Sequence, residues 1–433
     1  MDNHDNHGNH DIHGNHGNEN ARCDGYRVFT KEMKKDYTIL IPTMLPRHFR
    51  LLSGILRSYG YKTEILDNMG QSVIDEGLKY VHNDTCYPAQ LVIGQMIDAL
   101  ESGKYDKNKV ALMITQTGGG CRASNYIHLL RKALVKAGYG YAPVISLNFS
   151  GLEKHSAFKI TFPMLHRFAY AICYADLLME LVNQSKPYEV NKGESELLAD
   201  MWTERLTKEL TQNAISLSRS KKNYALMVQD FAKLPKNKVK KPRVGIVGEI
   251  FVKYSPLGNN NLEDFLVSEG AEVVVPGLLD FCLFVIYNSI MDRKLYGYNK
   301  KTILIYKFIL KLFCSMQKNL IRAIEKDGSF IPPCEFIKIP PLAEEVIGLG
   351  VKMGEGWLLT AEMIELIHVG ASNIVCTQPF GCLPNHIAGK GMMKPIKERY
   401  PHANIVAIDY DSGATKINQE NRIKLMLSSL SLY

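Results

Sequence analysis

The fold is decided by the stretch from Val110 to Ala137, VALMITQTGGGCRASNYIHLLRKALVKA. It begins with a continuous apolar run, Val110 to Ile114, which is typical of a strand buried on both faces. The glycines Gly118 to Gly120 then predict a tight turn, and the spacing of apolar residues from Tyr126 to Ala137 predicts a helix. This order of strand, turn and helix indicates an α/β fold and places Cys121 just before a helix.

A second cysteine, Cys86, is predicted to lie at the start of another helix. It belongs to the stretch Asn83 to Gln90, in which Thr85 is a residue type that caps helices and Pro88 is tolerated in a first helical turn. The residues Leu91 to Leu100 then have helical spacing. Helix N-termini favour the thiolate over the thiol, and the thiolate is the form that binds metal. Two such cysteines in one half of the chain predict a shared centre.

Strands and helices alternate around these two cysteines. Predicted strands cover Thr38 to Thr43, Tyr61 to Leu66, Val110 to Ile114 and Pro143 to Leu147. Helical patterns, including Arg47 to Tyr59, separate them. Such alternation predicts a parallel sheet covered by helices on both faces. Ligands bind at the carboxyl ends of the strands in such sheets, and Cys121 follows one of these ends.

The second half of the chain repeats this arrangement. The stretch Lys221 to Arg243 is lysine-rich, which is typical of a surface linker. Strands are then predicted at Arg243 to Val247, Glu272 to Val275, Ser372 to Cys376 and Asn404 to Ile408. Cys376 is expected at the carboxyl end of its strand, and Cys382 in the loop that follows. If the two units face each other, Cys86, Cys121 and either Cys376 or Cys382 can meet in the cleft between them.

The predicted organisation has four parts. They are a disordered His-rich extension over residues 1–35, a first α/β domain over 36–190, a helical segment with a basic linker over 191–242, and a second α/β domain over 243–433. Histidines at every third position from His4 to His16 make the extension either a solvated low-complexity tail or a metal-holding one. Cys173 lies in an apolar helical pattern and is interpreted as a core residue. Residues 278–325 mix apolar side chains and lysines at helical spacing, which favours core packing or a subunit interface over a membrane-surface helix.

Composition narrows the class of protein. The 433 residues carry a net charge of +8 and nine cysteines. No apolar run is long enough to span a membrane and no export segment is recognised, so we expect a cytoplasmic protein with reduced thiols. The phosphate-binding motifs of common ATPases and dinucleotide enzymes are missing, as is the elbow motif of serine hydrolases. The net charge is modest for the length and is interpreted as a solvated surface, with an acidic partner or a phosphorylated substrate as the alternative. No nucleic-acid partner is expected.

The cysteine spacing favours one kind of metal site over another. Structural zinc sites generally use paired Cys-x-x-Cys spacing, and the chain has none. Three or four thiolates brought together from distant loops suit a cubane iron-sulfur cluster. From spacing alone, ordinary buried cysteines explain the pattern equally well.

Several stretches resemble the 2-hydroxyacyl-CoA dehydratase family, most of all the dehydratase-like part of its activase-fused and double-cubane-cluster members. They are Asn83 to Ala99, Thr115 to Leu130, Gly248 to Phe265, Gly354 to Glu365 and Cys376 to Gly391. The similarity spans roughly residues 36 to 430. It implies two flavodoxin-like parallel-sheet domains, a helical connecting segment and a cysteine-bound cluster in the cleft between the domains.

The resemblance also implies a cofactor and a partner. The cofactor is a [4Fe-4S] cluster or a double-cubane [8Fe-9S] cluster, although only three or four of the roughly six thiolates that a double cubane needs can be placed. Cys86 and Cys121 match the first two ligand positions of the family, and Cys376 is chosen as the third. The implied partner is an ATP-hydrolysing iron-sulfur activase of the BadF/BadG/BcrA/BcrD type, expected to be a separate chain. A homodimer, or a heterodimer with a related subunit, is expected.

The function predicted from this resemblance is activase-dependent reduction. The chain receives low-potential electrons and uses them for a demanding reduction or a radical dehydration of a small substrate. Cys382 leaves an alternative open, because a fourth thiolate closes the cluster and makes the chain a non-catalytic electron-transfer or assembly subunit. A cluster-free α/β binding protein is the third interpretation.

Overall fold

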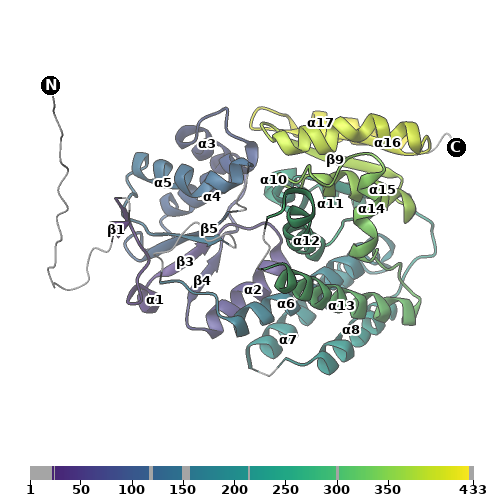
Figure 1. Cartoon of the computed structure of the whole chain (residues 1–433), viewed down its shortest axis with the longest axis horizontal. Coiled ribbons are helices and arrows are strands. Elements are labelled where there is room, and N and C mark those ends of the chain that lie inside the picture. Colours follow the sequence, from purple (N-terminus) through teal and green to yellow (C-terminus); the bar gives the residue numbers. More distant parts are fainter. Residues whose placement is uncertain are drawn as a thin grey trace.

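The computed structural model describes residues 22–23, 25–116, 120–148, 157–212, 215–298 and 302–428. The histidine tract and the glycines Gly118 and Gly119 lie outside these residues. Two parallel four-stranded sheets stand side by side, with a group of long helices packed against both (Figure 1). The predicted α/β fold class with two parallel sheets is confirmed.

The first sheet has the strand order β4-β3-β5-β6, with all pairs parallel. Its strands are β3 (Thr38–Ile41), β4 (Lys62–Ile65), β5 (Val110–Gln116) and β6 (Val144–Asn148), and its helices are α2 (Pro46–Ser58), α3 (Gln71–Tyr80), α4 (Tyr87–Glu101) and α5 (Tyr126–Lys136). Alternate residues of β3 enter different cores, since Ile39 packs on the side of α2 whereas Leu40 packs on the side of α4 and α5. Helices therefore cover both faces, as expected for a parallel sheet.

The second sheet has the order β10-β9-β7-β8 and is also parallel. Its strands are β7 (Arg243–Gly248), β8 (Glu272–Val274), β9 (Asn373–Pro379) and β10 (Asn404–Tyr410). Counted along the chain, both sheets have the order second, first, third, fourth, so the two domains repeat one topology. This is the strand order of the flavodoxin-like class.

Short helices surround the second sheet. They are α9 (Ile250–Tyr254), α10 (Pro256–Asn259), α11 (Leu262–Ser268), α14 (Ile339–Glu344), α15 (Trp357–His368), α16 (Met393–Arg399) and α17 (Lys416–Ser428), with single turns η3 (Phe336–Lys338), η4 (Asn385–Gly389) and η5 (Lys390–Met392). The helices α15 and α16 pack on one face, with Ile364 and Ile396 against Ile374. On the other face, α11 and α17 share a core with helices of the first domain, which joins the two domains.

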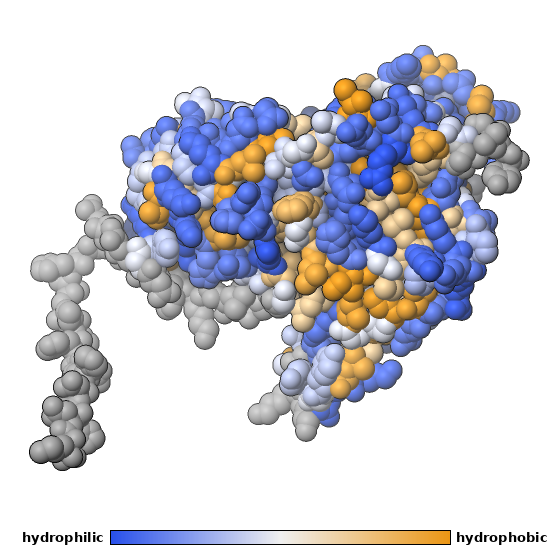
Figure 2. All heavy atoms as spheres, turned by 90° about the horizontal axis from the view of Figure 1, so that it is seen from above, coloured by the Kyte–Doolittle hydropathy of each residue, from blue (hydrophilic) through white to orange (hydrophobic). Residues whose placement is uncertain are grey.

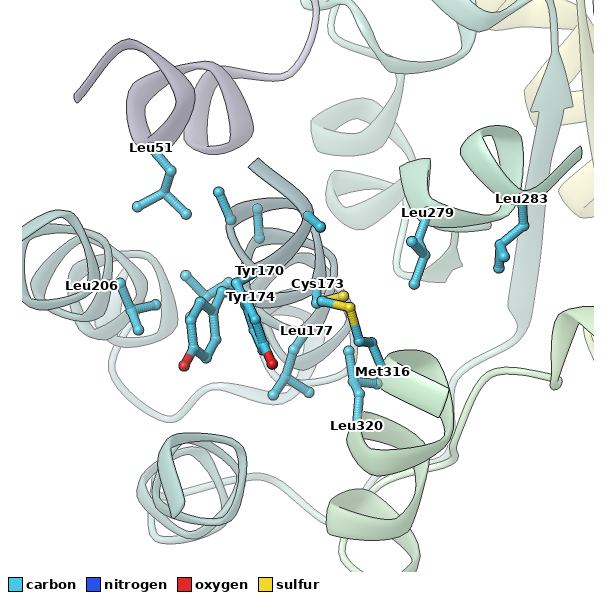
Figure 3. Close-up of a cluster of buried hydrophobic side chains, with 14 of the residues drawn as sticks. Leu51, Tyr170, Cys173, Tyr174, Leu177, Leu206, Leu279, Leu283, Met316 and Leu320 are labelled. Carbon is cyan, nitrogen blue, oxygen red and sulfur yellow. The ribbon is translucent and has the colours of Figure 1, made fainter. Parts of the chain in front are cut away.

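Five long helices form a third core below the sheets. They are α6 (Phe162–Asn183), α7 (Glu194–Gln212), α8 (Leu217–Ala232), α12 (Leu278–Tyr296) and α13 (Ile303–Asp327). Cys173 of α6 is fully buried beside Leu177 and Met316 (Figure 3), so its interpretation as a core residue is confirmed. The face seen in Figure 2 mixes hydrophilic side chains with hydrophobic patches. No helix in the described ranges is long and apolar enough to cross a membrane.

Two predicted boundaries are corrected. The lysine-rich linker was predicted from Lys221, but α8 continues to Ala232, because Tyr224, Val228 and Phe231 recur at helical spacing and are buried while the lysines face water. The ordered chain also begins before residue 36. It contains β1 (Arg22–Cys23), β2 (Tyr26–Arg27) and α1 (Met33–Asp36), with Met33 buried in the core under α2. The turns η1 (Arg122–Asn125) and η2 (Lys186–Tyr188) complete the described elements.

Candidate metal centre

The candidate site lies where the strand order of each sheet reverses. In the first sheet this point is between β3 and β5, and Cys121 follows β5. In the second sheet it is between β7 and β9, and Glu249 and Cys382 follow these two strands. In open parallel sheets, such reversal points at the carboxyl ends form the ligand crevice. Both crevices therefore contribute a cysteine.

Contacts between the domains bring the two crevices together. The backbone N–H of Tyr87 donates to the carbonyl of Phe380 at 3.0 Å, and that of Gly120 lies 3.1 Å from the sulfur of Met353. Gly381 packs so tightly that a Cβ there would lie 3.1 Å from the Cα of Cys86. The first domain is thus joined to the loop before Cys382.

Cys86 is the N-cap of α4 and is buried. Its sulfur lies 3.2 Å from the hydroxyl oxygen of Tyr126. The prediction that Thr85 caps this helix is wrong, because the helix starts one residue later and has no side-chain cap. Burial raises the pKa of Cys86, and the hydrogen bond from Tyr126 offsets only part of this rise. The expectation that the helix N-terminus favours the thiolate is therefore corrected, since desolvation is the larger effect in the metal-free chain.

Cys121 is the N-cap of the turn η1, so its predicted place just before a helix is confirmed. Its side chain is half-buried. A Cβ on Gly354 would lie 3.9 Å from its sulfur. Burial, with smaller contributions from the negative charges of Glu355, Cys86 and Glu249, raises the pKa of Cys121 to about 11. Both sheets thus contribute to the surroundings of this thiol.

Cys382 shares these surroundings. It is 6% exposed, and its own N–H donates to the carbonyl of Pro379 at 3.3 Å, which closes the loop after β9. Burial raises its pKa far above the ordinary value, followed by the charges of Glu355 and Glu249, while the backbone N–H of Asn385 favours the thiolate. The charge of Cys121 also acts on it. The charge of Glu249 thus raises the pKa of Cys86, Cys121 and Cys382, and the charge of Glu355 raises that of the last two.

Cys376 lies apart from this group. It was predicted at the end of its strand, but β9 continues to Pro379 because it pairs with β10 as far as Tyr410. Cys376 is therefore in the middle of β9, opposite Ala407, and its side chain is fully buried on the α15 side. Its sulfur lies 3.7 Å from Oδ1 of Asn385, and burial raises its pKa to about 12.

Glu249 and Glu355 were not singled out from the sequence. Glu249 caps α9 by accepting a hydrogen bond from the N–H of Val252 at 2.9 Å, and Glu355 accepts one from the N–H of Ile250 at 3.0 Å. Both side chains are buried. Burial raises the pKa of Glu249 to about 8, with the charge of Glu355 as the next cause, and burial also raises the pKa of Glu355. The signal that points to Glu249 is its position directly after a buried strand.

A second group of buried charges lies behind the site. Lys253 of α9 donates to both carboxylate oxygens of Glu362 at 2.9 and 3.2 Å, and both side chains are almost fully buried. Asp280 and Glu365 are also buried, and burial raises the pKa of each. The positive charge of Lys253 lowers the pKa of Glu249 and Glu355 as well. The charge of Lys253 thus lowers the pKa of carboxyl groups both at the candidate site and in the group behind it.

The donor set fits an iron-sulfur cluster better than a single ion. Within the part of the chain that the structure describes, no three side chains of His, Cys, Asp or Glu converge closely enough to hold one metal ion. In a cubane each thiolate binds a different iron, so its ligands stand farther apart. Three thiols from separate loops suit this, and Gly381 and Gly354 let their loops approach the backbone of Cys86 and the side chain of Pro384 more closely than a larger residue would. Cys86, Cys121 and Cys382 are the residues that would hold a cluster.

The remaining cysteines with described side chains lie away from this site. Cys173 and Cys282 are in the helices α6 and α12, and Cys314 is in α13. Cys334 lies before η3 and packs with Cys314 against the helical core. A comparison of the whole chain with protein-family models and with curated proteins found no match.

Proposed function

We propose that the chain is an iron-sulfur protein whose cluster is bound by Cys86, Cys121 and Cys382. It accepts low-potential electrons from an ATP-hydrolysing activase and uses them for a demanding reduction or a radical dehydration of a small substrate. The observation that carries this proposal is the placement of Cys86, Cys121 and Cys382 at the facing reversal points of two parallel sheets, with Cys86 and Cys382 buried and Cys121 half-buried. The resemblance to the 2-hydroxyacyl-CoA dehydratase family supports it.

The number of thiols matters for the chemistry. A cubane held by three thiolates has one iron free for a small oxygen-containing ligand, whereas four thiolates mainly support electron transfer. Cys376 is buried in the middle of β9 on the α15 side, so Cys86, Cys121 and Cys382 are the three thiols at the crevice. This supports an enzyme over an electron carrier.

The two carboxyl groups give the site a means of moving protons. Because the pKa of Glu249 is about 8, this group holds its proton at neutral pH and can donate it to a bound substrate. Glu355 is the next group, and a negative charge on either one raises the pKa of the other. Loss of hydroxide from a substrate needs such a proton donor in a site from which water is largely excluded.

Anaerobic purification followed by iron and sulfide analysis tests the proposal. The wild-type chain should contain about four iron and four sulfide per chain, as one cubane requires. Its electron paramagnetic resonance spectrum should appear on reduction and change when cyanide or a candidate acyl-CoA is added. A colourless, iron-free chain after attempted cluster reconstitution contradicts the proposal, and a spectrum that ignores every added ligand contradicts the enzymatic part of it.

A further inference from the structure

The first half of α13 presents apolar side chains to water. None of the residues from Ile303 to Ser315 is buried. Leu304 is 76% exposed, Phe308 68% and Leu312 43%. These three lie four residues apart and form one stripe along the helix, with Ile305 beside it. Exposed apolar stripes of this kind mark interaction surfaces.

Basic residues predominate along the segment that carries this stripe, and the nearest acidic partners are Glu335, paired with Lys318, and Asp292, paired with Lys352. The segment from residue 293 to 322 contains eight lysines and arginines and no aspartate or glutamate. Lys307 and Lys311 lie on α13 one residue before Phe308 and Leu312, and both are exposed. The surface therefore combines an apolar centre with a basic rim, which is the anatomy of a protein interface with an acidic partner.

This surface continues to the candidate metal centre. Tyr296, at the end of α12, is half-exposed, and a Cβ on Gly350 would lie 3.0 Å from its hydroxyl oxygen. Lys352 pairs with Asp292 of the same helix. Two residues further along this loop, Gly354 packs against Cys121. One short loop thus contacts the end of α12 on one side and the thiol site on the other.

Exposed apolar side chains also flank the thiols themselves. Met353 is 47% exposed and contacts Gly120, which precedes Cys121. Phe380 and Leu383, on either side of Cys382 in the loop after β9, are 50% and 66% exposed. A partner that covers α13 and these loops would therefore also cover the exposed apolar side chains next to Cys121 and Cys382.

We propose that the apolar surface formed by the start of α13, the end of α12 and the loop at Met353 is the docking surface for an acidic electron-donor protein. The inference rests on the proposed function and names the face that receives the donor. A second copy is disfavoured as the occupant, because two such surfaces would bring like charges together. An anionic lipid surface would also complement the positive charge of this surface, but it does not explain why the apolar surface extends to the thiols.

The test measures the rate at which a purified ATP-hydrolysing iron-sulfur activase reduces the cluster, at low and high salt. The charge variant combines Lys307→Glu with Lys311→Glu, and the apolar variant is Phe308→Ser. Each should lower the second-order rate at least tenfold at low salt, and the charge variant should lose most of the salt dependence. Reduction by the small reductant dithionite should be unchanged in both, because it needs no docking surface.

Matched controls lie on the far side of the second domain. Lys394→Glu with Lys397→Glu changes the net charge equally on α16, and Leu425→Ser removes an exposed leucine of α17, so neither should alter the rate. Unchanged activase rates in the α13 variants overturn the inference while the proposed function stands. If the activase fails to reduce the wild-type cluster although dithionite reduces it, both the inference and the proposed function are contradicted. Two further results would overturn the inference. If wild type sediments with vesicles of anionic phosphatidylglycerol and the α13 variants do not, the surface binds lipid. If wild type self-associates and the α13 variants do not, the surface binds a second copy.

Discussion

The backbone N–H of Tyr87 donates a hydrogen bond to the carbonyl of Phe380 at 3.0 Å. It ties the first residue of α4 to the loop after β9; Cys86 directly precedes Tyr87, and Cys382 follows Phe380 by two residues. The contact joins domains that are separated by nearly 300 positions in the sequence.

Serine at the three gathered cysteines should remove the cluster. In Cys86→Ser, Cys121→Ser and Cys382→Ser a thiolate is replaced by a hydroxyl that binds iron poorly, so iron per chain should fall sharply in each. Cys376→Ser is the matched control, because this residue is buried in the middle of β9. Iron and sulfide analysis of each variant checks this prediction. If Cys382→Ser keeps its full iron and Cys376→Ser loses it, Cys376 is the ligand and Cys382 is not.

Alanine at Gly381 should weaken the junction. The residue has a φ of +70°, and an added Cβ would lie 3.1 Å from Cys86. Gly270 is the control, since its φ is +87° but nothing lies within 4 Å of an added Cβ. Both substitutions carry the left-handed backbone strain of about 1–2 kcal/mol. Gly381→Ala should destabilise more in urea unfolding and should also retain less iron, and equal effects of the two would show that the close contact is unimportant.

Removing the buried cation should be strongly destabilising. In Lys253→Met the carboxylate of Glu362 loses its partner, so we expect a loss of about 3–5 kcal/mol in the free energy of unfolding. The loss should grow with pH, because without Lys253 the carboxyl group avoids its burial penalty only while protonated. Adding Glu362→Gln should restore much of the stability. Urea unfolding at two pH values measures these changes in the free energy of unfolding. The control is Lys394→Met, which breaks an exposed pair with Glu398 and should change the free energy of unfolding little.

Asparagine at Asp280 should alter the pH dependence of stability. Burial, Asp176 and Glu362 raise the pKa of Asp280 to about 8. The folded chain thus keeps a proton that the unfolded chain loses near pH 4, and this contribution to stability is lost as the pH rises towards 8, by up to about 1.4 kcal/mol per pH unit. Asp280→Asn should therefore gain stability over wild type as the pH rises from 5 to 8.

The amide in this variant can still accept the hydrogen bond that Gln317 donates at 2.7 Å. Asp67→Asn is the control, because the Asp67 side chain is 85% exposed. Urea unfolding at pH 5 and pH 8 measures the free energy of unfolding of wild type and both variants. A stability difference between Asp280→Asn and wild type that stays constant over this range would show that Asp280 is ionised in the folded chain.

The sequence alone predicted the alternation of strands and helices, because buried parallel strands require continuous apolar runs and their helices require a 3.6-residue period. It therefore located both sheets, and it placed Cys86 and Cys121 just before helices. It missed α3, and it ended β9 at Cys376 because a loop with turn residues follows soon after. These errors are local, since strand ends depend on a neighbour that lies elsewhere in the chain.

Only the tertiary structure decided which side chains meet. The pairing of β9 with β10 carries the strand past Cys376, and side chains alternate between the two faces of a sheet, so this thiol is buried beneath α15 while Cys382 reaches the crevice. The carboxyl groups of Glu249 and Glu355 join the thiols only because the two domains face each other. Local patterns in the sequence determine periodicity and caps, whereas the meeting of groups from distant loops, and the burial that raises their pKa values, depends on how the sheets are placed against each other.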